Sequence, residues 1–410
     1  MTKIVIRDYQ EKDFKAIERI WQECGWLEGS MESTMQEIIK DSHIKVAEID
    51  GSVEASAMAT DAQVQYLDEV IQANVINAVT VSLVARKIGL ANKALAALLA
   101  DEAEKGVPLS VLGMFEQGFY DKLGYGTGSY FRQLHVDPAE LNIPVKCRIP
   151  KRLSKDDFQA IHQNRLNRIK LHGRFDMLSP IATKSEMEFH KKSFGLGYYN
   201  EAGRLTHHLW IDPSDQESGP YYIVWYAYET NEQLLELLAL LQSFNNQVRE
   251  ISITEPADIQ LLDFMKKPIH SKVVTKGNKF QNYLNSYAYW QLRLLDPIAC
   301  LEQTSLHTED LELNLILSDP IEQYLPVDSK WRGCGGKYTL LLGKKCCLRK
   351  DFKADLPVLS ASINAFSRMW LGLKPASGLA CSDDLAADAD LLNQLDNAFC
   401  LPEPQPDWWF

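Results

Sequence analysis

Residues 79–126 read VTVSLVARKIGLANKALAALLADEAEKGVPLSVLGMFEQGFYDKLGYG. Apolar residues alternate at Val79, Val81 and Leu83, which predicts a strand. A basic turn over residues 86–91 then precedes an Ala/Leu-rich segment with helical spacing, and residues 109–112 predict a second, buried strand. The stretch therefore predicts a strand, a turn, a helix, a second strand and then a short helix that ends in an aromatic element.

The basic turn has the composition of an anion site. A helix start has about four unpaired N–H donors and a partial positive charge, which suits a pyrophosphate. Arg86 and Lys87 add two cations, Gly89 lets the backbone approach closely, and Ala91 leaves room. The pattern R-x-x-G-x-A resembles the acetyl-coenzyme A (acetyl-CoA) loop of the GNAT acetyltransferases. A glycine in a basic turn before a helix is also common elsewhere, so the neighbouring segments have to support it.

An aromatic element supplies that support. Residues 119–126 read FYDKLGYG, which resembles the F-Y-x-K-x-G-F element that ends a GNAT core. The resemblance implies that the strand after the cofactor helix diverges from its neighbour. The pantetheine arm would then hydrogen-bond strand backbone in the gap, with Tyr120 near the thioester.

Length, composition and charge limit the alternatives. A chain of 410 residues predicts about two or three domains, and 46% hydrophobic residues suffice for sizeable cores. We find no run of about 18 uncharged apolar residues and no signal-like apolar segment at the N-terminus, so we expect a cytoplasmic protein without a membrane span. The net charge of −12 argues against a nucleic-acid partner. It is compatible with cationic substrates, and equally with a simple contribution to solubility.

Cysteines and histidines give no sign of a metal site. The eight cysteines include no C-x-x-C pair, and we interpret them as reduced thiols. The nine histidines are scattered, and His207 and His208 are expected to flank the start of a strand rather than to bind zinc. No metal cofactor is expected.

Three regions can be distinguished, at residues 1–145, 146–295 and 296–410. The second repeats a strand, helix, strand, helix order, with helices over 231–244 and 257–265, but residues 229–234 read ETNEQL and lack the basic loop. The third alternates strands with a helix that carries Phe366, Met369 and Trp370. It resembles a sterol-carrier-protein type domain, although such an apolar stripe is more often ordinary core than a lipid pocket.

The succession of regions resembles the enhanced intracellular survival (Eis) acetyltransferases over essentially the whole chain. The resemblance implies an α+β fold, with two tandem GNAT folds followed by a sterol-carrier-protein-like domain. It also implies a homo-oligomer, commonly a hexamer.

The same resemblance assigns two catalytic roles. Tyr120 would be the general acid that protonates the departing coenzyme A thiolate, and the α-carboxylate of Phe410 would be the base. The chain ends in DWWF, and a terminus with three aromatic rings is expected to pack rather than to fray, with its anchor in the first domain. The alternative is a packed apolar plug without catalytic use. Tyr125, the other tyrosine of the element, is the alternative acid, ranked lower because it matches the packing position of the motif.

Cofactor and substrate residues follow from the resemblance. The strand segment Val79, Thr80 and Val81 would offer backbone to pantetheine and acetyl group, and the pyrophosphate would be surrounded by Arg86, Lys87, Gly89, Leu90 and Ala91. Ala85 and Ile88 stand where further cations often occur, which predicts weaker cofactor affinity. Trp26, Glu28 and Glu32 would border an acidic amine cleft; the plain alternative is a solvated loop.

We therefore expect an acetyl-CoA-dependent N-acetyltransferase for small amines such as polyamines or aminoglycosides, acting by direct attack in a ternary complex. Two alternatives stay open. One is a lysine acetyltransferase acting on proteins, and the other is a lipid or peptide carrier with a degenerate first domain.

Overall fold

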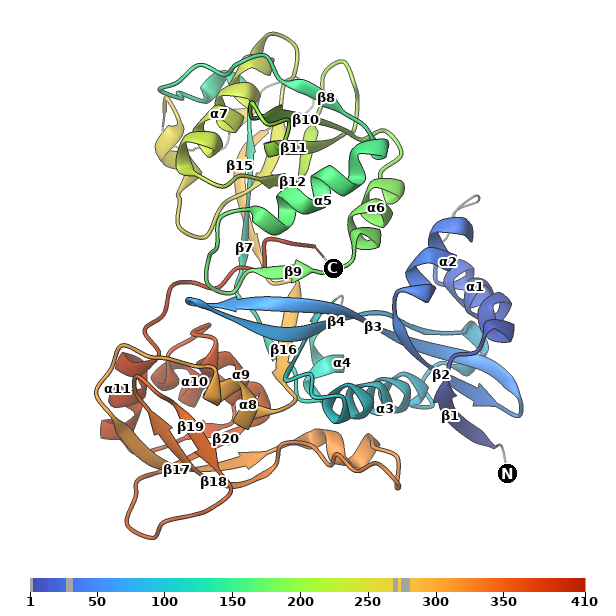
Figure 1. The fold of residues 1–410 in the computed structure, drawn as a ribbon, viewed down its shortest axis with the longest axis vertical. Coiled ribbons are helices and arrows are strands. Elements are labelled where there is room, and N and C mark those ends of the chain that lie inside the picture. Colours follow the sequence, from blue (N-terminus) through green and yellow to red (C-terminus); the bar gives the residue numbers. More distant parts are fainter. Residues whose placement is uncertain (1–2, 27–31, 115, 268–271, 274–280, 410) are drawn as a thin grey trace. The chain divides into compact units, whose positions relative to one another are not determined.

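The computed structural model describes residues 3–26, 32–114, 116–267, 272–273 and 281–409 (Figure 1). The chain forms two compact units. The first comprises residues 1–129, 289–404 and 409–410, and the second comprises residues 130–288 and 405–408. The C-terminal tail therefore belongs to both.

The main sheet of the first unit has the strand order β1-β2-β3-β4-β5-β16-β6. Strands β1 to β4 pair antiparallel, β4 and β5 pair parallel, and β16 is antiparallel to both β5 and β6. The bounds are β1 (Ile4–Asp8), β2 (His43–Ile49), β3 (Ser52–Tyr66), β4 (Glu69–Val81), β5 (Leu109–Gly113), β6 (Gly126–Thr127) and β16 (Trp290–Leu294).

Helices cover both faces of this sheet because successive strand residues point to opposite sides. Val46 packs in a cluster with α1 (Phe14–Glu23) and α2 (Glu32–Lys40), whereas the next residue, Ala47, packs in a cluster with α3 (Leu90–Glu104). Four of the buried strand residues in the cluster with α3 are alanines, Ala47, Ala55, Ala57 and Ala59, and their small side chains leave room for the helix against the sheet. The short helix α4 (Gln117–Asp121) follows β5.

Residues 296–404 add a second sheet and four helices to the first unit. The sheet order is β19-β18-β17-β20-β21. The side chains of Phe366, Met369 and Trp370 are fully buried, as ordinary core positions are. The bounds are α8 (Pro297–Glu302), β17 (Leu311–Ser318), β18 (Gly336–Leu342), β19 (Cys347–Arg349), β20 (Val358–Ser362), α9 (Ile363–Trp370), α10 (Ala376–Ser382), β21 (Leu385–Ala386) and α11 (Ala389–Ala398).

The second unit has one sheet, in the order β14-β15-β7-β13-β12-β11-β10-β8. Its parallel pair β12 and β13, joined by helix α7, repeats the β4, α3, β5 arrangement of the first unit. The bounds are β7 (Phe131–Val136), β8 (Lys151–Leu153), α5 (Phe158–Asn167), β9 (Phe175–Met177), α6 (Pro180–Phe189), β10 (Phe194–Tyr199), β11 (Leu205–Pro213), β12 (Tyr221–Ala227), α7 (Asn231–Gln242), β13 (Ile251–Thr254), β14 (Lys272–Val273) and β15 (Gln281–Tyr287).

The structure differs from the sequence expectations at the region boundaries. β7, expected in the first region, lies between β13 and β15 of the second unit, and β16, expected in the second region, completes the sheet of the first. Each unit thus takes in a strand that the sequence places with its neighbour. The helix expected over 257–265 is only a 3-10 helix at Leu261–Phe264, because the Glu255 carboxylate accepts the Leu261 N–H and begins the helical turn there.

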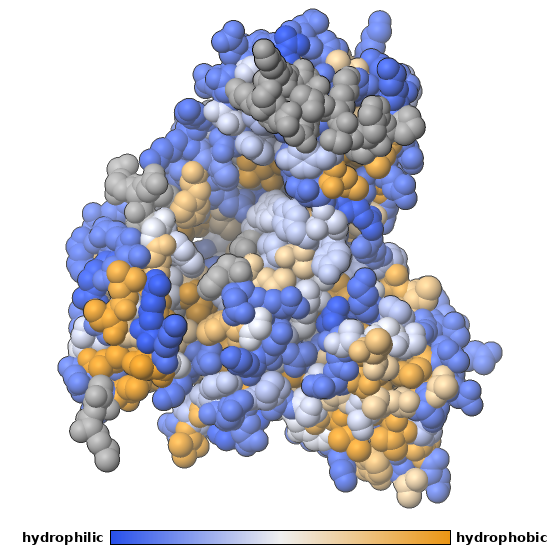
Figure 2. All heavy atoms as spheres, turned by 180° about the vertical axis from the view of Figure 1, so that it is seen from behind, coloured by the Kyte–Doolittle hydropathy of each residue, from blue (hydrophilic) through white to orange (hydrophobic). Residues whose placement is uncertain are grey.

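The surface carries scattered apolar side chains. On the face drawn in Figure 2, hydrophobic residues lie among hydrophilic ones. Among the described helices, none is long and apolar enough to cross a membrane.

Candidate active site

Strands β4 and β5 diverge at one end. Their parallel pairing runs from Ala73 and Leu109 to Ile76 and Leu112, and no β5 partner is described for residues 77–81. A register shift in the β3–β4 pairing and the positive φ of Ala78, 48°, mark a bulge where the divergence begins. Bulges of this kind re-aim a strand and end its pairing. Within the described part of the chain, the β4 segment that the sequence assigns to pantetheine therefore has no strand partner on the β5 side.

The hydroxyl of Thr80 does not face this edge. Thr80 is buried, and its Oγ1 lies 2.9 Å from the Oγ of Ser56 on the neighbouring strand β3. Val79 and Val81 pack at the margin of the cluster that contains α3. What this segment offers to a ligand at the open edge is backbone.

The loop after β4 is an exposed helix start. Arg86, Lys87 and Gly89 are exposed, whereas Leu90 is buried and anchors the first turn of α3. Gly89 is the N-cap with φ 81°, a left-handed conformation that glycine adopts without strain, and no side chain caps the helix there. A side-chain carbon at Gly89 would meet nothing within 4 Å. The N–H groups of the first turn are thus open to an external anion.

The equivalent helix of the second unit begins differently. The side chain of Thr230 caps α7 by accepting the N–H of Gln233, and Glu232 lies in the first turn. A capped and acidic helix start does not favour a second anion. The two repeats therefore differ at the position where the first carries its open loop.

Tyr120 lies in α4 and packs in the same apolar cluster as Leu90, Val79 and Val81. Only 3% of its surface is exposed, and its ring meets that of Phe119 edge-on with centroids 4.8 Å apart. Burial raises the pKa of the Tyr120 phenol to about 12, and the Glu116 charge adds to the shift. The phenol is therefore protonated at neutral pH, as a proton donor has to be.

Tyr125 has a different environment. It is fully buried, and its hydroxyl lies 2.7 Å from that of Ser110 on β5. Burial raises the pKa of Tyr125 as well. This hydroxyl belongs to the packed core, in line with the packing position inferred from the motif.

The residues expected to bind the amine are only partly described. Trp26 is 42% exposed, and its ring centroid lies 6.1 Å from that of Trp21. Glu32, at the start of α2, forms an exposed ion pair with Lys15 at 2.9 Å. Glu28 lies outside the described residues.

The aromatic tail is divided between the units. Trp409 packs against Tyr289 of the first unit, with ring centroids 4.3 Å apart and the ring planes tilted by 34°, whereas Trp408 belongs to the second unit. The expectation that the rings anchor the tail in the first domain is therefore wrong for Trp408. Its indole N–H has an acceptor in the second unit, Glu186. Phe410, whose carboxylate was assigned as the base, lies outside the described residues.

A cavity of about 810 Å³ borders α4 in the first unit. Asp121, next to Tyr120 in sequence, lines it together with Asn364 and Arg368 of α9. Burial raises the pKa of Asp121, whose carboxylate accepts a hydrogen bond of 2.6 Å from Gln291 Nε2. Sequence analysis missed this cavity because its walls come from segments more than 190 residues apart. Of the residues assigned to amine binding, the two that the structure describes, Trp26 and Glu32, do not line it.

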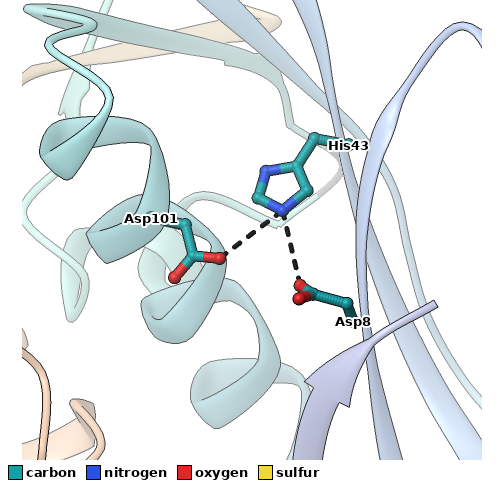
Figure 3. Close-up of side chains that lie close together, drawn as sticks. All are labelled: Asp8, His43 and Asp101. Carbon is teal, nitrogen blue, oxygen red and sulfur yellow. Dashed lines mark ion pairs between the residues drawn. The ribbon is translucent and has the colours of Figure 1, made fainter.

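Asp8, His43 and Asp101 have potential metal-ligand atoms within 4.8 Å of one another (Figure 3). The His43 Nε2 lies 3.6 Å from Asp8 Oδ1 and 3.5 Å from Asp101 Oδ2. The ammonium of Lys45 is closer to the same two oxygens, at 2.7 and 2.6 Å, and the two carboxylates raise its pKa. The acidic charge is thus balanced by an ion pair, and a metal would have to displace Lys45.

Comparison with known proteins agrees with this geometry. Residues 5–128 match the family described as "Acetyltransferase (GNAT) domain". The chain carries a GNAT acetyltransferase domain. No curated protein matches the chain in sequence.

The whole chain has the fold of several solved GNAT structures. A probable N-acyltransferase of Enterococcus faecalis aligns over 100% of both chains with a TM-score of 0.83 and 18% identity. A GCN5-related N-acetyltransferase of Anabaena variabilis aligns over 100% of both chains with a TM-score of 0.79 and 14% identity. Eis1 of Mycobacterium abscessus also aligns over 100% of both chains, with a TM-score of 0.76 and 14% identity. The mixed α/β fold class expected from the sequence, with GNAT folds in tandem, is confirmed.

Proposed function

We propose that the protein transfers an acetyl group from acetyl-CoA to the primary amine of a small molecule, by direct attack in a ternary complex. The observation that carries this proposal is the edge of β4 over residues 77–81, for which the described residues give no β5 partner, followed after a short 3-10 helix at Leu83–Ala85 by the uncapped N-terminus of α3. A ligand that needs both is an extended, amide-containing arm attached to a pyrophosphate. Acetyl-CoA has that form and supplies an activated thioester.

The strand and the loop bind different parts of acetyl-CoA. The backbone of Val79, Thr80 and Val81 hydrogen-bonds the arm in place of a partner strand. Arg86 and Lys87, both exposed, pair with phosphate oxygens.

The first turn of α3 completes the anion site. The helix start at Gly89, Leu90 and Ala91 donates N–H groups to the pyrophosphate. Ala85 and Ile88 are neutral, so the loop has fewer positive charges for the phosphates than the loops that it resembles. This predicts a modest affinity for acetyl-CoA.

Tyr120 assists the departure of the leaving group. Its phenol, protonated at neutral pH, donates a hydrogen bond to the sulfur as negative charge develops there. The pKa of about 12 lies well above the usual thiol value of about 8.5. Donating a hydrogen bond to the sulfur in the transition state is therefore the main contribution of Tyr120; the phenol keeps its proton, and the departing thiolate takes up a proton from water.

The α-carboxylate of Phe410 handles the proton of the amine. An alkylamine is mostly protonated near pH 7, so attack requires a group that binds the ammonium and accepts its proton. We assign the binding of the substrate ammonium to Trp26, Glu28 and Glu32, because acidic and aromatic side chains attract a cation. Assembly as a homo-oligomer, with a hexamer as the expectation from the Eis resemblance, belongs to the same proposal.

Thiol release from acetyl-CoA tests the proposal with polyamines, aminoglycosides and lysine peptides as acceptors. The enzyme forms are wild type, Tyr120→Phe, a chain with one glycine appended after Phe410, and Tyr130→Phe as a control at an exposed tyrosine. We expect small amines to react, the first two variants to lose most activity while still binding acetyl-CoA, and Tyr130→Phe to match wild type. Faster reaction of lysine peptides would favour a protein acetyltransferase. Absence of coenzyme A binding would favour a carrier and overturn the proposal.

A further inference from the structure

The C-terminal tail passes from one compact unit to the other along an ordered path. Its approach is fixed in the first unit, where the hydroxyl of Ser129 donates to the carbonyl of Pro404. In the second unit, Gln405 is buried and its Nε2 donates to the carbonyl of Glu255 at 3.0 Å. The carbonyl of Pro406 then accepts the N–H of Phe175, at the start of β9, at 3.1 Å. The first two contacts of the tail with the second unit, at Gln405 and Pro406, are thus made to backbone groups, and the charged side chains follow at Asp407.

Asp407 forms a bidentate ion pair with Arg168. Arg168 Nε lies 2.7 Å from Asp407 Oδ2 and its Nη2 lies 2.6 Å from Oδ1, which is the bidentate geometry of a strong, oriented contact. The Arg168 side chain is only 4% exposed, and its Nη1 donates to Asp176 at 2.6 Å. Asp176 is fixed in turn by Arg174. Both carboxylates raise the pKa of Arg168, so its guanidinium is always charged.

The backbone of Asp407 has an unusual conformation at its contact with Arg168. Its φ is 45°, in the left-handed region that residues with a side chain rarely adopt. Such a conformation persists where surrounding contacts determine it. The bidentate contact with Arg168 is such a contact, and it turns the chain immediately before its last three residues.

Trp408 is enclosed by groups of the second unit. It is 1% exposed, and its indole Nε1 donates to Glu186 Oε1 at 3.0 Å. The guanidinium of Arg165 lies 3.6 Å from the Trp408 ring centroid and 4.3 Å from that of Trp225. Arg165 also pairs with Glu186, so the cation that stacks on the indole and the carboxylate that accepts its N–H fix each other.

We propose that the second unit is a clamp for the C-terminus. Arg168, Arg165 and Glu186 are its positioning residues, and Asp407 and Trp408 are the elements of the tail that it holds. Chain ends ordinarily fray, and buried charges are retained only where they are paired. Here the paired charges Arg165 and Glu186 lie against Trp408, two residues before Phe410.

The geometry gives the clamp a consequence for catalysis. From Trp408, two further residues reach at most about 7 Å. In the proposed function, holding Trp408 would therefore limit how far the α-carboxylate of the last residue can move. This consequence rests on the proposed function, in which that carboxylate accepts the amine proton; the clamp itself does not.

The test uses the full chain with Asp407→Asn. Asparagine keeps the size of the side chain and tolerates positive φ, so the substitution removes the charge and one acceptor oxygen without adding backbone strain. The matched control is Glu229→Gln, which breaks a bidentate pair with Arg204 elsewhere in the second unit, where Arg204 is 45% exposed. Three quantities are measured for each: release of Phe410 by a carboxypeptidase that prefers aromatic residues, kcat, and KM for acetyl-CoA.

We expect Asp407→Asn to speed release of Phe410 at least tenfold and to lower kcat at least tenfold, with KM for acetyl-CoA unchanged, and Glu229→Gln to match wild type. Asp407→Glu, which restores the charge, should recover part of both losses. Unchanged release of Phe410 in Asp407→Asn would overturn the clamp, whatever happens to kcat. Faster release with unchanged kcat would support the clamp and overturn the role of the terminal carboxylate as base.

Discussion

The hydroxyls of Tyr125 and Ser110 lie 2.7 Å apart in the core of the first unit. The ring of Tyr120 lies close by, with its centroid 6.2 Å from that of Tyr125. The two tyrosines belong to one sequence element and one apolar cluster. The Tyr125 hydroxyl is hydrogen-bonded to Ser110 on the core strand β5, which is a packing role, and we keep for Tyr120 the proton-donating role that the sequence motif assigns to it.

Phenylalanine substitutions separate these roles. Tyr125→Phe leaves the Ser110 hydroxyl buried without this partner, so we expect a loss of about 1–3 kcal/mol in the free energy of unfolding. Its kcat should stay close to that of wild type. Tyr120→Phe should lower kcat by about 10²-fold or more, since it removes the proton donor, with a smaller effect on stability. Urea unfolding and steady-state kinetics measure the four quantities, and the reverse pattern would assign the acid to Tyr125.

Gly89 is expected to matter for the cofactor more than for stability. Gly89 and Gly106, at the two ends of α3, have φ of 81° and 89°, and a side-chain carbon at either would meet nothing within 4 Å. Alanine at each position should therefore cost about 1–2 kcal/mol of stability through backbone strain. Only Gly89→Ala should also weaken acetyl-CoA binding, by about tenfold, because the strain falls on the loop that approaches the pyrophosphate.

Isothermal titration with acetyl-CoA and thermal unfolding measure the two effects. Gly106→Ala is the control, because it carries the same strain away from the loop. Equal loss of affinity in both variants would show that α3 as a whole, and not its N-terminus, determines binding.

Alkaline pH should reveal the burial of Tyr120. Its pKa is about 12 in the folded chain, against about 10 unfolded. The unfolded chain then binds fewer protons between these values, so stability is intact below pH 10 and falls as pH rises toward 12. The shift corresponds to about 2.7 kcal/mol. The fall between pH 10 and 12 should be shallower in Tyr120→Phe than in wild type, and identical slopes in urea unfolding would contradict this burial.

The local part of the site could be predicted from sequence. The β4, loop, α3, β5 order is encoded by alternation, by Gly89 and by helical spacing within one continuous stretch, so neighbouring residues determine it. The position of Tyr120 in a short helix after β5 follows from the same stretch.

The remainder depends on distant pairing. β16 was assigned to the wrong region because its apolar pattern fits any buried strand, and only the hydrogen bonds to β5 decide where it lies. Asp407 and Arg168 are 239 residues apart, and neither has a local pattern that points to the other. Sequence therefore predicted that the aromatic tail packs, but assigned the whole tail to the first unit, whereas Trp408 belongs to the second.

Acid should destabilise the protein through His208. This residue lies inside β11 with no exposed surface, where Trp225 Nε1 donates to its Nε2 at 3.0 Å and its Nδ1 lies 2.7 Å from Asn164 Oδ1. The ring therefore donates from Nδ1 and is neutral. Burial lowers the pKa of His208 to about 3, with the nearby Arg165 charge adding to the shift.

The sign of the effect follows from the direction of that shift. An unfolded histidine titrates near 6.5, so between pH 6.5 and 3 the unfolded chain binds more protons than the folded one. Stability is complete above pH 6.5 and falls as pH drops through this window, by an amount on the order of 5 kcal/mol for this residue. His208→Gln keeps an acceptor for Trp225 and a donor for Asn164 but cannot titrate. We expect it to be less stable than wild type at pH 7.5 and to lose less stability between pH 6.5 and 4.5.

Urea unfolding across this range makes the comparison, with the exposed His307→Gln as the control for removing a histidine. The control should follow the wild-type profile. If His208→Gln loses stability as steeply as wild type does, the acid sensitivity arises elsewhere, and the buried His162, whose pKa burial lowers to about 4, becomes the residue to replace next.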